Sequence, residues 1–485
     1  MLRRILDSPW FYFGAALLLL LAAVVTQFEV HLPSRNVKPL SELASLRERK
    51  DLNLVFILVD TLRADRLSSY GYGRPTTPII DEIAGHGILF ENVVSQSSWT
   101  KTSMASLWTS TNPMRNGILR YNHVLPSEAR MPAEILHEAG FRTVGLWRNG
   151  WVEPNFGFDQ GFEVYVRPMP NGDKGVHRQS PGGEPLGGTD EDLVTSAADF
   201  LDRFGHDKFF LYLHFMDLHQ YVYDDRSAVF GTSYSDIYDQ SVNWTDRLIG
   251  LFLKRLDERG LLPRTVVAIA SDHGEAFREH GFEGHARNLY SEVTHVPLVI
   301  SLPFRIDPPI RVTQTVSNAD IWPTLLDLLG LPELPGANGR SLLPMVRAAG
   351  GLEPGGPIDE RPVYAQIARG WGNPKAQAES IVSVTDKGKR LIVNLDKPKE
   401  SEFYDRGADP GEHKNLLSED GAEAAPLQSL LDSYALDSTP PWGTEPTEVK
   451  LDEMRLNQLR ALGYVIGGDE GAHKKEKKGK EPAGR

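Results

Sequence analysis

The stretch NLVFILVDTLRAD, residues 53–65, decides the fold class of this sequence. Its apolar run from Leu54 to Val59 is short, β-prone and uncharged, which predicts a buried strand. The run ends at Asp60, where polar residues lead into the next element. Further runs of the same kind follow at residues 209–215, 266–270 and 296–301. The chain therefore repeats one pattern, a buried strand that ends in polar residues.

Amphipathic stretches lie among these runs, at residues 81–86, 132–139, 191–204 and 246–259. Strands that alternate with helices predict an α/β fold, in which helices cover both faces of a mostly parallel sheet. Ligands bind to such sheets beyond the carboxyl ends of the strands. Acidic residues and histidines at strand ends are therefore candidates for a functional site.

Composition limits the function classes. A chain of 485 residues suits a large α/β domain with an added subdomain. The formal net charge of −13 argues against nucleic-acid binding, which normally requires a basic face. The chain has no cysteine, which excludes disulfides, thiolate metal sites and a cysteine nucleophile.

Changes in composition divide the chain further. We expect a linker with room for one helix over residues 31–50, a catalytic domain over 51–330 and a smaller C-terminal α+β subdomain over 331–435. The subdomain begins in a stretch rich in Pro and Gly, and strand-like sequence resumes at residues 381–393. Residues 436–485 predict one more helix, within 450–465, followed by a basic, disordered tail.

The first thirty residues predict an N-terminal transmembrane helix. No charge interrupts the sequence from Ser8 to Phe28, which is long enough to span a bilayer. Arg3 and Arg4 precede this run, so the positive-inside rule leaves them in the cytoplasm. The catalytic domain is then membrane-anchored and periplasmic or extracellular. A cleaved signal peptide is the alternative, although no small-x-small cleavage site follows the run.

Four segments carry candidate chemistry, at residues 59–65, 99–109, 271–275 and 280–298. Each also has an ordinary structural explanation. Asp60 and Thr100 suit helix capping, and the pair Asp272-His273 suits a surface turn. Together, however, these residues supply carboxylate, imidazole and hydroxyl groups. That combination suits a divalent metal and an oxygen nucleophile.

From about residue 53 to residue 462 the chain resembles the sulfatase family of the alkaline phosphatase superfamily. NLVFILVDTLRADRLSSYGY resembles the family's opening strand with its metal-binding aspartate, and SDHGEAFREHGFEGHARNLYSEVTHVPLVI resembles its Asp-His-Gly metal motif. SNADIWPTLLDLLGLP is similar to the family's Asp-x-x-Pro-Thr helix. EFYDRGADPGEHKNL and LRALGYV resemble its C-terminal signatures. The resemblance implies an alkaline-phosphatase-like fold.

The sequence departs from the family at the nucleophile. Formylglycine sulfatases carry Cys or Ser, followed by x-Pro-Ser-Arg and then an Ala-x-Leu-x-Thr-Gly stretch. Aligning Ala105–Thr109 with that stretch puts Thr100 at the nucleophile position. Threonine cannot become formylglycine, which is an oxidised Cys or Ser. Threonine nucleophiles occur in superfamily members that act on phosphodiesters, phosphonates and phospho-headgroups. Residues 146–149 also replace the usual Gly-Lys-Trp-His segment.

The resemblance and the ligand types together imply a metal site. We expect Asp60, Thr100, Asp272 and His273 to bind one divalent cation. An oxygen-rich shell with one imidazole fits calcium, magnesium or manganese, and zinc is a further possibility.

The resemblance also implies residues around that cation. His219 and His285 are expected to stabilise an oxyanion or protonate the leaving group, and structural histidines are the alternative. Asp217 follows the family's Asp-x-His pattern and is expected to bind substrate, or to form a second metal site with His219 and His285. Lys101 and Asn149 are expected in the anion pocket. Two further histidines are expected to be structural, His280 and His295.

We therefore predict a metal-dependent hydrolase of sulfate or phosphate esters, with a sulfated or phosphorylated glycan, lipid or small molecule as substrate. One alternative is a transferase that passes phosphoethanolamine or phosphoglycerol to an envelope lipid or glycan. The other is a catalytically degenerate protein that binds an anionic glycan. The joint presence of Asp60, Thr100, Asp272 and His273 argues against degeneration.

Overall fold

The computed structural model describes residues 35–172, 175–178, 187–352, 360–370, 372–373, 378–460 and 466. The predicted membrane anchor, residues 1–30, and the predicted basic tail lie outside these residues. Over the ranges just given, no helix combines the length and the apolar character that crossing a bilayer requires.

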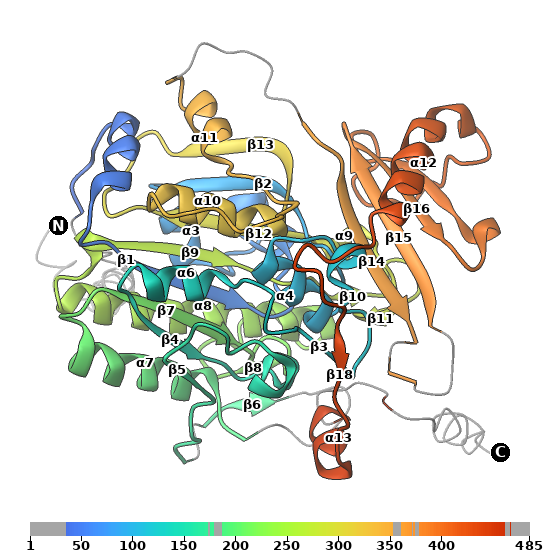
Figure 1. The fold of residues 1–485 in the computed structure, drawn as a ribbon. Coiled ribbons are helices and arrows are strands. Elements are labelled where there is room, and N and C mark those ends of the chain that lie inside the picture. The colour runs from blue at the N-terminus through green and yellow to red at the C-terminus, as the bar shows by residue number, and fades with distance from the viewer. Residues whose placement is uncertain are drawn as a thin grey trace, which may run out of the picture. The chain divides into compact units, whose positions relative to one another are not determined.

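An eight-stranded sheet forms the centre of residues 35–485 (Figure 1). Strand β12 runs antiparallel to both of its neighbours, and the other pairings are parallel. The prediction of a mostly parallel sheet is therefore confirmed. In spatial order the strands are β13 (Ile310–Ser317), β2 (Ile88–Val94), β12 (His295–Ser301), β9 (Thr265–Ala270), β1 (Asn53–Val59), β7 (Phe209–Phe215), β4 (Arg142–Leu146) and β5 (Val164–Val166).

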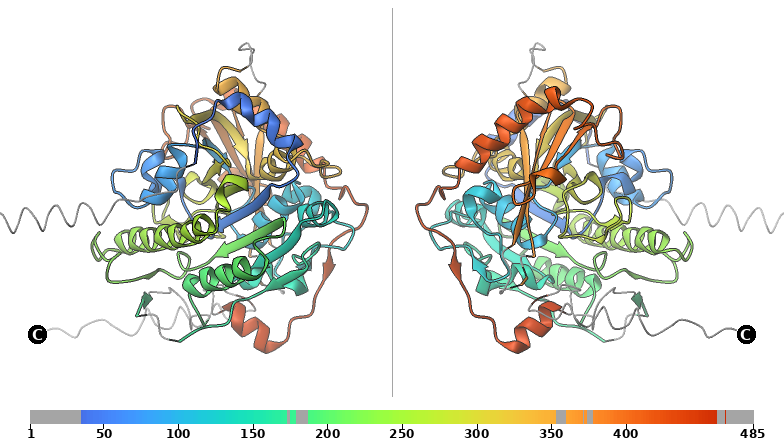
Figure 2. Two further views of the ribbon diagram at one scale, coloured as in Figure 1. Left: turned by 90° about the vertical axis from the view of Figure 1, so that its left-hand side faces the viewer. Right: turned by 90° about the vertical axis from the view of Figure 1, so that its right-hand side faces the viewer.

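Helices cover both faces of this sheet, as the alternation in the sequence predicts. On one face β1 presents Phe56, whose ring centre lies 6.0 Å from that of Trp108 and 5.2 Å from that of Trp322. These tryptophans belong to α4 (Thr100–Thr109) and α10 (Ile321–Leu328), and α6 (Pro132–Glu138) joins the same core. The views in Figures 1 and 2 show α7 (Asp190–Phe204) and α8 (Tyr234–Glu258) side by side along the sheet, and α3 (Pro78–Ala84) contacts α8.

The register of the central strands fixes the edge at which the site forms. Leu58 on β1 lies opposite His214 on β7 and Ala270 on β9. Because these strands are parallel, the residues two positions beyond Leu58 and Ala270 leave the sheet at the same level. Those residues are Asp60 and Asp272.

The C-terminal subdomain is a four-stranded antiparallel sheet with α12 (Gly421–Leu436) packed on it (Figure 2). The predicted strand-like region 381–393 forms two of its strands. Its start was predicted at residue 331, but α11 (Leu343–Ala349) packs against β13 of the large sheet. The subdomain's own strands therefore begin later, and they are β14 (Val363–Arg369), β15 (Glu379–Asp386), β16 (Lys389–Asn394) and β17 (Glu402–Asp405).

The second half of the predicted linker, residues 31–50, contains a helix, for which the prediction allowed. Residues Leu40–Glu48 form a 3-10 helix, η1, with Leu40, Leu43 and Leu46 buried. These leucines recur every third residue, which places them on one face of a three-residue turn, and this face packs into the core near α10. The segment is part of the folded unit.

Short elements complete the chain. Strand β18 pairs with β3, and α13 lies within the range predicted for a last helix. These elements are β3 (His123–Val124), β18 (Thr447–Glu448), α13 (Glu453–Arg460), α5 (Pro113–Asn116), α9 (Ser291–Thr294), β6 (His177–Arg178), β8 (Val222–Tyr223), β10 (Ala276–Phe277) and β11 (Glu283–Gly284).

Candidate active site

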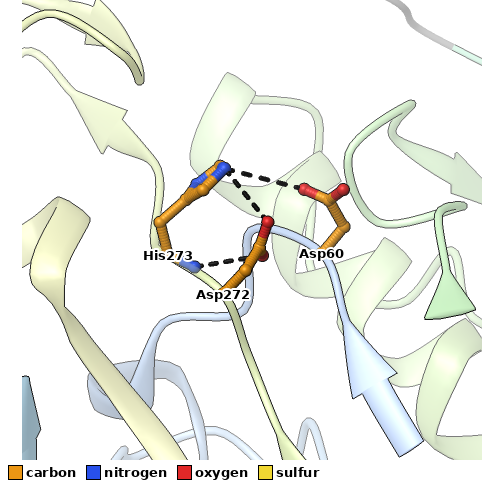
Figure 3. Close-up of side chains that lie close together, drawn as sticks. All are labelled: Asp60, Asp272 and His273. Carbon is orange, nitrogen blue, oxygen red and sulfur yellow. Dashed lines mark hydrogen bonds and ion pairs between the residues drawn. The ribbon is translucent and has the colours of Figure 1, made fainter. Parts of the chain in front are cut away.

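Asp60, Asp272 and His273 meet at the carboxyl edge of β1 and β9 (Figure 3). One potential ligand atom from each lies within 4.8 Å of the other two, and all three side chains are buried. His273 Nε2 lies 3.4 Å from Asp272 Oδ2 and 3.9 Å from Asp60 Oδ1. The structure thus brings together three of the four residues predicted to bind the metal.

The hydrogen bonds of these carboxylates leave one oxygen of each available. Asp60 Oδ2 accepts from Asn149 at 2.5 Å, and Asp272 Oδ1 accepts from its neighbour's amide, that of His273, at 3.0 Å. Within the described residues, Asp60 Oδ1 and Asp272 Oδ2 are buried with no hydrogen-bond donor. Buried carboxylate oxygens are normally paired or bound to a metal. The donor set therefore fits a divalent cation held by oxygen ligands and one imidazole.

The charges in this cluster depend on one another. Burial and the neighbouring charge of Asp60 raise the pKa of the Asp272 carboxyl to about 6. Burial opposes ionisation of Asp60 as well, but a hydrogen bond from His214 and the imidazoles of His219 and His273 hold the pKa of Asp60 below its ordinary value. Two carboxylates this close repel each other, and a divalent cation between them would remove that repulsion.

Thr100 joins the cluster from a different element. It is the first residue of α4, and its hydroxyl Oγ1 lies 3.1 Å from His273 Nε2 and 3.4 Å from Asn149 Nδ2. The alternative explanation of helix capping does not fit, because Trp99 occupies the capping position. Asp60 is likewise no cap, since Arg63 occupies the N-cap position of the next helical turn, Ala64–Arg66. The fourth predicted ligand therefore lies beside the other three.

Of the two residues predicted for the anion pocket, Asn149 contacts the cluster, whereas Lys101 contacts other groups. The Asn149 amide bonds to both Asp60 and Thr100. The ammonium group of Lys101 donates to the carbonyl of Tyr121 at 2.7 Å and lies 3.4 Å from the centre of the Phe156 ring. Adjacent residues of a helix point about 100° apart, so Lys101 cannot face the point that Thr100 faces. Burial holds the pKa of Lys101 well below its usual value.

The rings of His219 and His285 lie beside the cluster. The centre of the His285 ring lies 4.5 Å from that of His273 and 4.9 Å from that of His219. Burial lowers the pKa of His219 to about 4 and that of His285 well below its ordinary value. Both imidazoles are therefore neutral at neutral pH, so each ring has one nitrogen that donates and one that accepts.

Asp217 is a correction to the prediction. It was expected to bind substrate or a second metal, but it forms a buried ion pair with Arg148 at 2.5 Å. Its other oxygen accepts from the Trp244 indole at 2.9 Å. Both oxygens are thus occupied inside the protein, and the second metal site with His219 and His285 lacks its carboxylate.

Three residues that contact the cluster or its neighbours were not predicted from the sequence. His214 bonds to Asp60 Oδ2 at 3.2 Å, and a polar residue within the apolar run 209–215 is the signal that would have found it. Glu275 lies in the same segment as the metal motif and binds His285 Nδ1 at 3.0 Å. Ser103 donates to the main-chain carbonyl of Asp272 at 2.6 Å, and no feature of the sequence indicates that contact.

The two histidines predicted to be structural are confirmed as such. His280 bonds to Glu292 Oε1 at 2.9 Å and to the carbonyl of Glu412 at 2.8 Å, which joins it to the C-terminal subdomain. His295 bonds to the carbonyl of Glu91 on β2 at 2.8 Å.

A mostly parallel sheet with acidic, imidazole and hydroxyl groups at its carboxyl edge is an arrangement that suits a metal-dependent hydrolase. A sequence profile of the sulfatase family matches residues 52–331. A second profile, described as N-sulphoglucosamine sulphohydrolase, C-terminal, matches residues 278–434. The chain belongs to the sulfatase family and is a hydrolase of the type that acts on sulfuric esters.

Individual relatives agree with this family. The chain is 26% identical over 458 residues to the ulvan-active sulfatase of Formosa agariphila, covering 86% of this chain and 85% of that protein. It is 30% identical over 174 residues to arylsulfatase K of Gallus gallus, and this match covers 36% of this chain and 31% of that protein.

A solved structure shows that this fold also occurs in an enzyme named for a phosphorus substrate. The phosphonate monoester hydrolase of Agrobacterium radiobacter superposes with a TM-score of 0.64 at 18% identity, covering 79% of this chain and 95% of that one. At such identity the likeness concerns the fold alone. The fold by itself therefore does not decide between sulfur and phosphorus as the atom attacked.

Proposed function

We propose that this protein hydrolyses sulfate esters of anionic glycans, with Thr100 as the nucleophile and a divalent cation at Asp60, Asp272 and His273. The position of the Thr100 hydroxyl carries the proposal, since it lies 3.1 Å from His273 Nε2 beside two carboxylate oxygens that have no donor. A buried threonine at a helix start needs no such neighbours for capping.

The cation, when bound, would lower the pKa of the Thr100 hydroxyl and offset the negative charge of the ester. Thr100 Oγ1 attacks sulfur, the bond from sulfur to the ester oxygen breaks, and the alcohol leaves with a proton. Water then attacks sulfur, releases sulfate and restores the hydroxyl. Asn149 orients Asp60 and Thr100 through its amide, and the neutral imidazole of His219 donates a hydrogen bond to a sulfuryl oxygen. His285, which is held by Glu275 through Nδ1, takes up a proton at its second nitrogen and returns it to the leaving alcohol.

A glycan sulfate is the substrate class we favour. A relative that matches 86% of this chain is named for activity on ulvan, and the second profile is named for a sulphohydrolase of N-sulphoglucosamine. A threonine nucleophile serves phosphorus equally well, so phosphate esters must be tested beside sulfate esters.

A paired substrate panel tests the proposal. The purified protein, loaded with Ca²⁺, Mg²⁺ or Mn²⁺ in turn, is given 4-nitrophenyl sulfate, 4-nitrophenyl phosphate, bis(4-nitrophenyl) phosphate and a sulfated glycan. We expect sulfate release from the aryl sulfate and from the glycan, and loss of both in Thr100→Ala. Faster hydrolysis of either phosphate ester would reassign the reaction to phosphorus. Glycan binding without release of sulfate would favour the degenerate alternative.

We also propose that residues 1–30 anchor the chain in a membrane, with the catalytic domain on the outer side. The support is the uncharged run from Ser8 to Phe28 preceded by Arg3 and Arg4. A glycan substrate outside the cytoplasm agrees with that location.

A further inference from the structure

A buried ion network joins the loops that follow β4 and β7. Arg148 Nη1 lies 2.7 Å from Asp190 Oδ1 and 2.5 Å from Asp217 Oδ1. Its Nη2 donates to the carbonyl of Gly188 at 2.7 Å. The guanidinium side chain is 3% exposed and neither carboxylate is exposed at all. The guanidinium of Arg148 therefore links three segments that lie far apart in the sequence.

The two carboxylates are held by further donors. Asp217 Oδ2 accepts from the Trp244 indole and from the amide of Asp190, each at 2.9 Å. Asp190 in turn accepts from the amides of Met216 at 3.0 Å and Asp217 at 2.7 Å. Asp190 begins helix α7, so the network also includes the start of a helix. The loop after β7 is thereby fixed through both its main chain and its side chains.

Stability alone does not account for this network. Two carboxylates face one guanidinium without solvent, and burial together with the charge of Asp217 raises the pKa of Asp190 to about 6. Replacing a buried ion pair by apolar side chains is often neutral or stabilising. Because burying these charges costs free energy, we attribute the network to the positions in which it holds the attached loops.

Those positions belong to the active site. Arg148 directly precedes Asn149, whose amide lies 2.5 Å from Asp60 Oδ2 and 3.4 Å from Thr100 Oγ1. The main chain at Asn149 is extended, and neighbouring side chains on extended backbone point to opposite sides. Arg148 can therefore be anchored on one side while Asn149 reaches the cluster on the other. At the far end of the network, Asp217 lies two residues before His219.

We propose that Arg148 is a positioning residue, which binds Asp190 and Asp217 and so fixes Asn149 against Asp60 and Thr100. The same contacts fix the loop that carries His219. The inference rests on the proposed function, in which Asn149 and His219 act on the reacting groups. A displacement of about 1 Å at such groups is enough to reduce turnover about 100-fold.

The test uses Arg148→Lys and Arg148→Met. Lysine keeps the charge but lacks the planar guanidinium that reaches two carboxylates and a carbonyl together. Arg148→Lys should therefore have little more activity than Arg148→Met. We expect kcat on 4-nitrophenyl sulfate to fall ~10–100-fold in both variants, with a much smaller change in KM. Asn149→Ala should lower kcat in the wild type but cause little further loss of kcat in the Arg148→Met background. Both changes remove the same contact, that of the Asn149 amide with Asp60 and Thr100.

Arg390 supplies a matched control. Its side chain is also fully buried and also pairs with a carboxylate, Glu412 at 3.1 Å, but on β16 of the C-terminal subdomain. Arg390→Met should lower the melting temperature while kcat of the folded protein stays near the wild-type value. Equal losses of kcat in the two methionine variants would show a general effect of removing a buried arginine and would overturn the proposal.

A crystal structure of Arg148→Met gives a readout that does not depend on activity. We expect the Asn149 amide to have moved out of hydrogen-bonding distance of Asp60. An unmoved Asn149, or a folded Arg148→Met protein with wild-type kcat, would overturn the proposal. A wild-type protein that hydrolyses no ester would instead overturn the proposed function, and the position of Asn149 in the variant would still decide this inference.

Discussion

The hydroxyl of Thr100 lies 3.1 Å from Nε2 of His273, although 173 residues separate them in the chain. The same ring nitrogen faces one oxygen each of Asp60 and Asp272. A hydroxyl, an imidazole and two carboxylates thus converge from the ends of two strands and the start of a helix. These elements belong to the large sheet or pack on it, and the packing brings the four groups together.

Thr100→Ala should lower turnover by several orders of magnitude, because no other oxygen takes over the covalent step. Thr100→Ser should keep partial activity, since a hydroxyl remains but its rotamer is less restricted without the methyl group. Stopped reactions analysed by mass spectrometry should show a peptide with sulfate on Thr100.

Thr102→Ala is the control for Thr100. Thr102 is buried on the same helix and its hydroxyl donates to the carbonyl of Ile118 at 2.7 Å. This variant should lose ~1 kcal/mol of stability and keep its turnover. A Thr100→Ala enzyme with wild-type turnover would remove the nucleophile from the proposal while leaving the fold in place.

Asp272→Asn should weaken cation binding and abolish turnover while the protein stays folded. The change keeps the size of the side chain but removes one negative charge from the ligand set. Metal content by mass spectrometry and affinity by calorimetry give the measurement. Asp246→Asn is the comparison, because Asp246 is also buried but accepts from the amides of Ile79 and Ile80 at α3. Unchanged metal content in Asp272→Asn would exclude this residue as a ligand.

Stability should depend on pH through His280. Burial lowers the pKa of this histidine, but hydrogen bonds to Glu292 and to the Glu412 carbonyl outweigh burial and raise it to about 9. A folded-state pKa above the unfolded value of about 6.5 gives stability that is complete below that pH and is lost as the pH rises through about 9. His280→Gln should therefore melt ~2–4 °C lower than wild type at pH 6, with little difference at pH 10. A constant difference across this range would mean that the charge of His280 does not contribute.

Tyr238→Phe should destabilise the turn after Asp60. Thr61 has a left-handed φ of 61°, which is unfavourable for a β-branched residue. The Tyr238 hydroxyl donates to the carbonyl of Thr61 at 2.7 Å and accepts from the amide of Arg63 at 3.0 Å. Removing it leaves two buried main-chain groups unpaired, at a cost of ~1–3 kcal/mol, and should also weaken cation binding. Tyr234→Phe, which loses only a bond to another tyrosine hydroxyl, should do neither.

A reporter fusion tests the membrane anchor. A phosphatase reporter that is active only outside the cytoplasm, joined after residue 36, should be active in cells. Residue 36 precedes the buried leucines of η1, so the fusion does not cut into the folded unit. Replacing Arg3 and Arg4 with glutamate should lower this activity, because the positive charges set the orientation. An inactive fusion would reverse the proposed topology.

Local sequence was sufficient wherever the signal lies within one element. The run Leu54 to Val59 predicts β1 to within one residue, and the runs at 209–215 and 266–270 predict β7 and β9 equally well. Parallel strands bring their carboxyl ends to one edge, so Asp60, Asp272 and His273 could be expected to meet there. Their common place after buried strands is a property of the sequence alone.

Contacts between distant elements escaped prediction. Asp217 follows a buried strand just as Asp60 does, yet its partner is Arg148, and no pattern in either segment indicates that pairing. Lys101 adjoins Thr100 in the chain but binds Tyr121, because the helix turns it away. The neighbours of a side chain depend on which elements pack together, and local periodicity does not encode that.

The sequence by itself determined the α/β class, the strand ends that carry Asp60, Asp272 and His273, and the family resemblance. Only the tertiary structure decided which polar groups face the cluster: it added His214 and Glu275, retained Asn149, and assigned Asp217 and Lys101 to other partners. The physical reason is the range of the interactions concerned. Strand formation follows from burial over a few consecutive residues, whereas a hydrogen bond or ion pair requires two groups within about 3 Å, and chain folding alone brings them there.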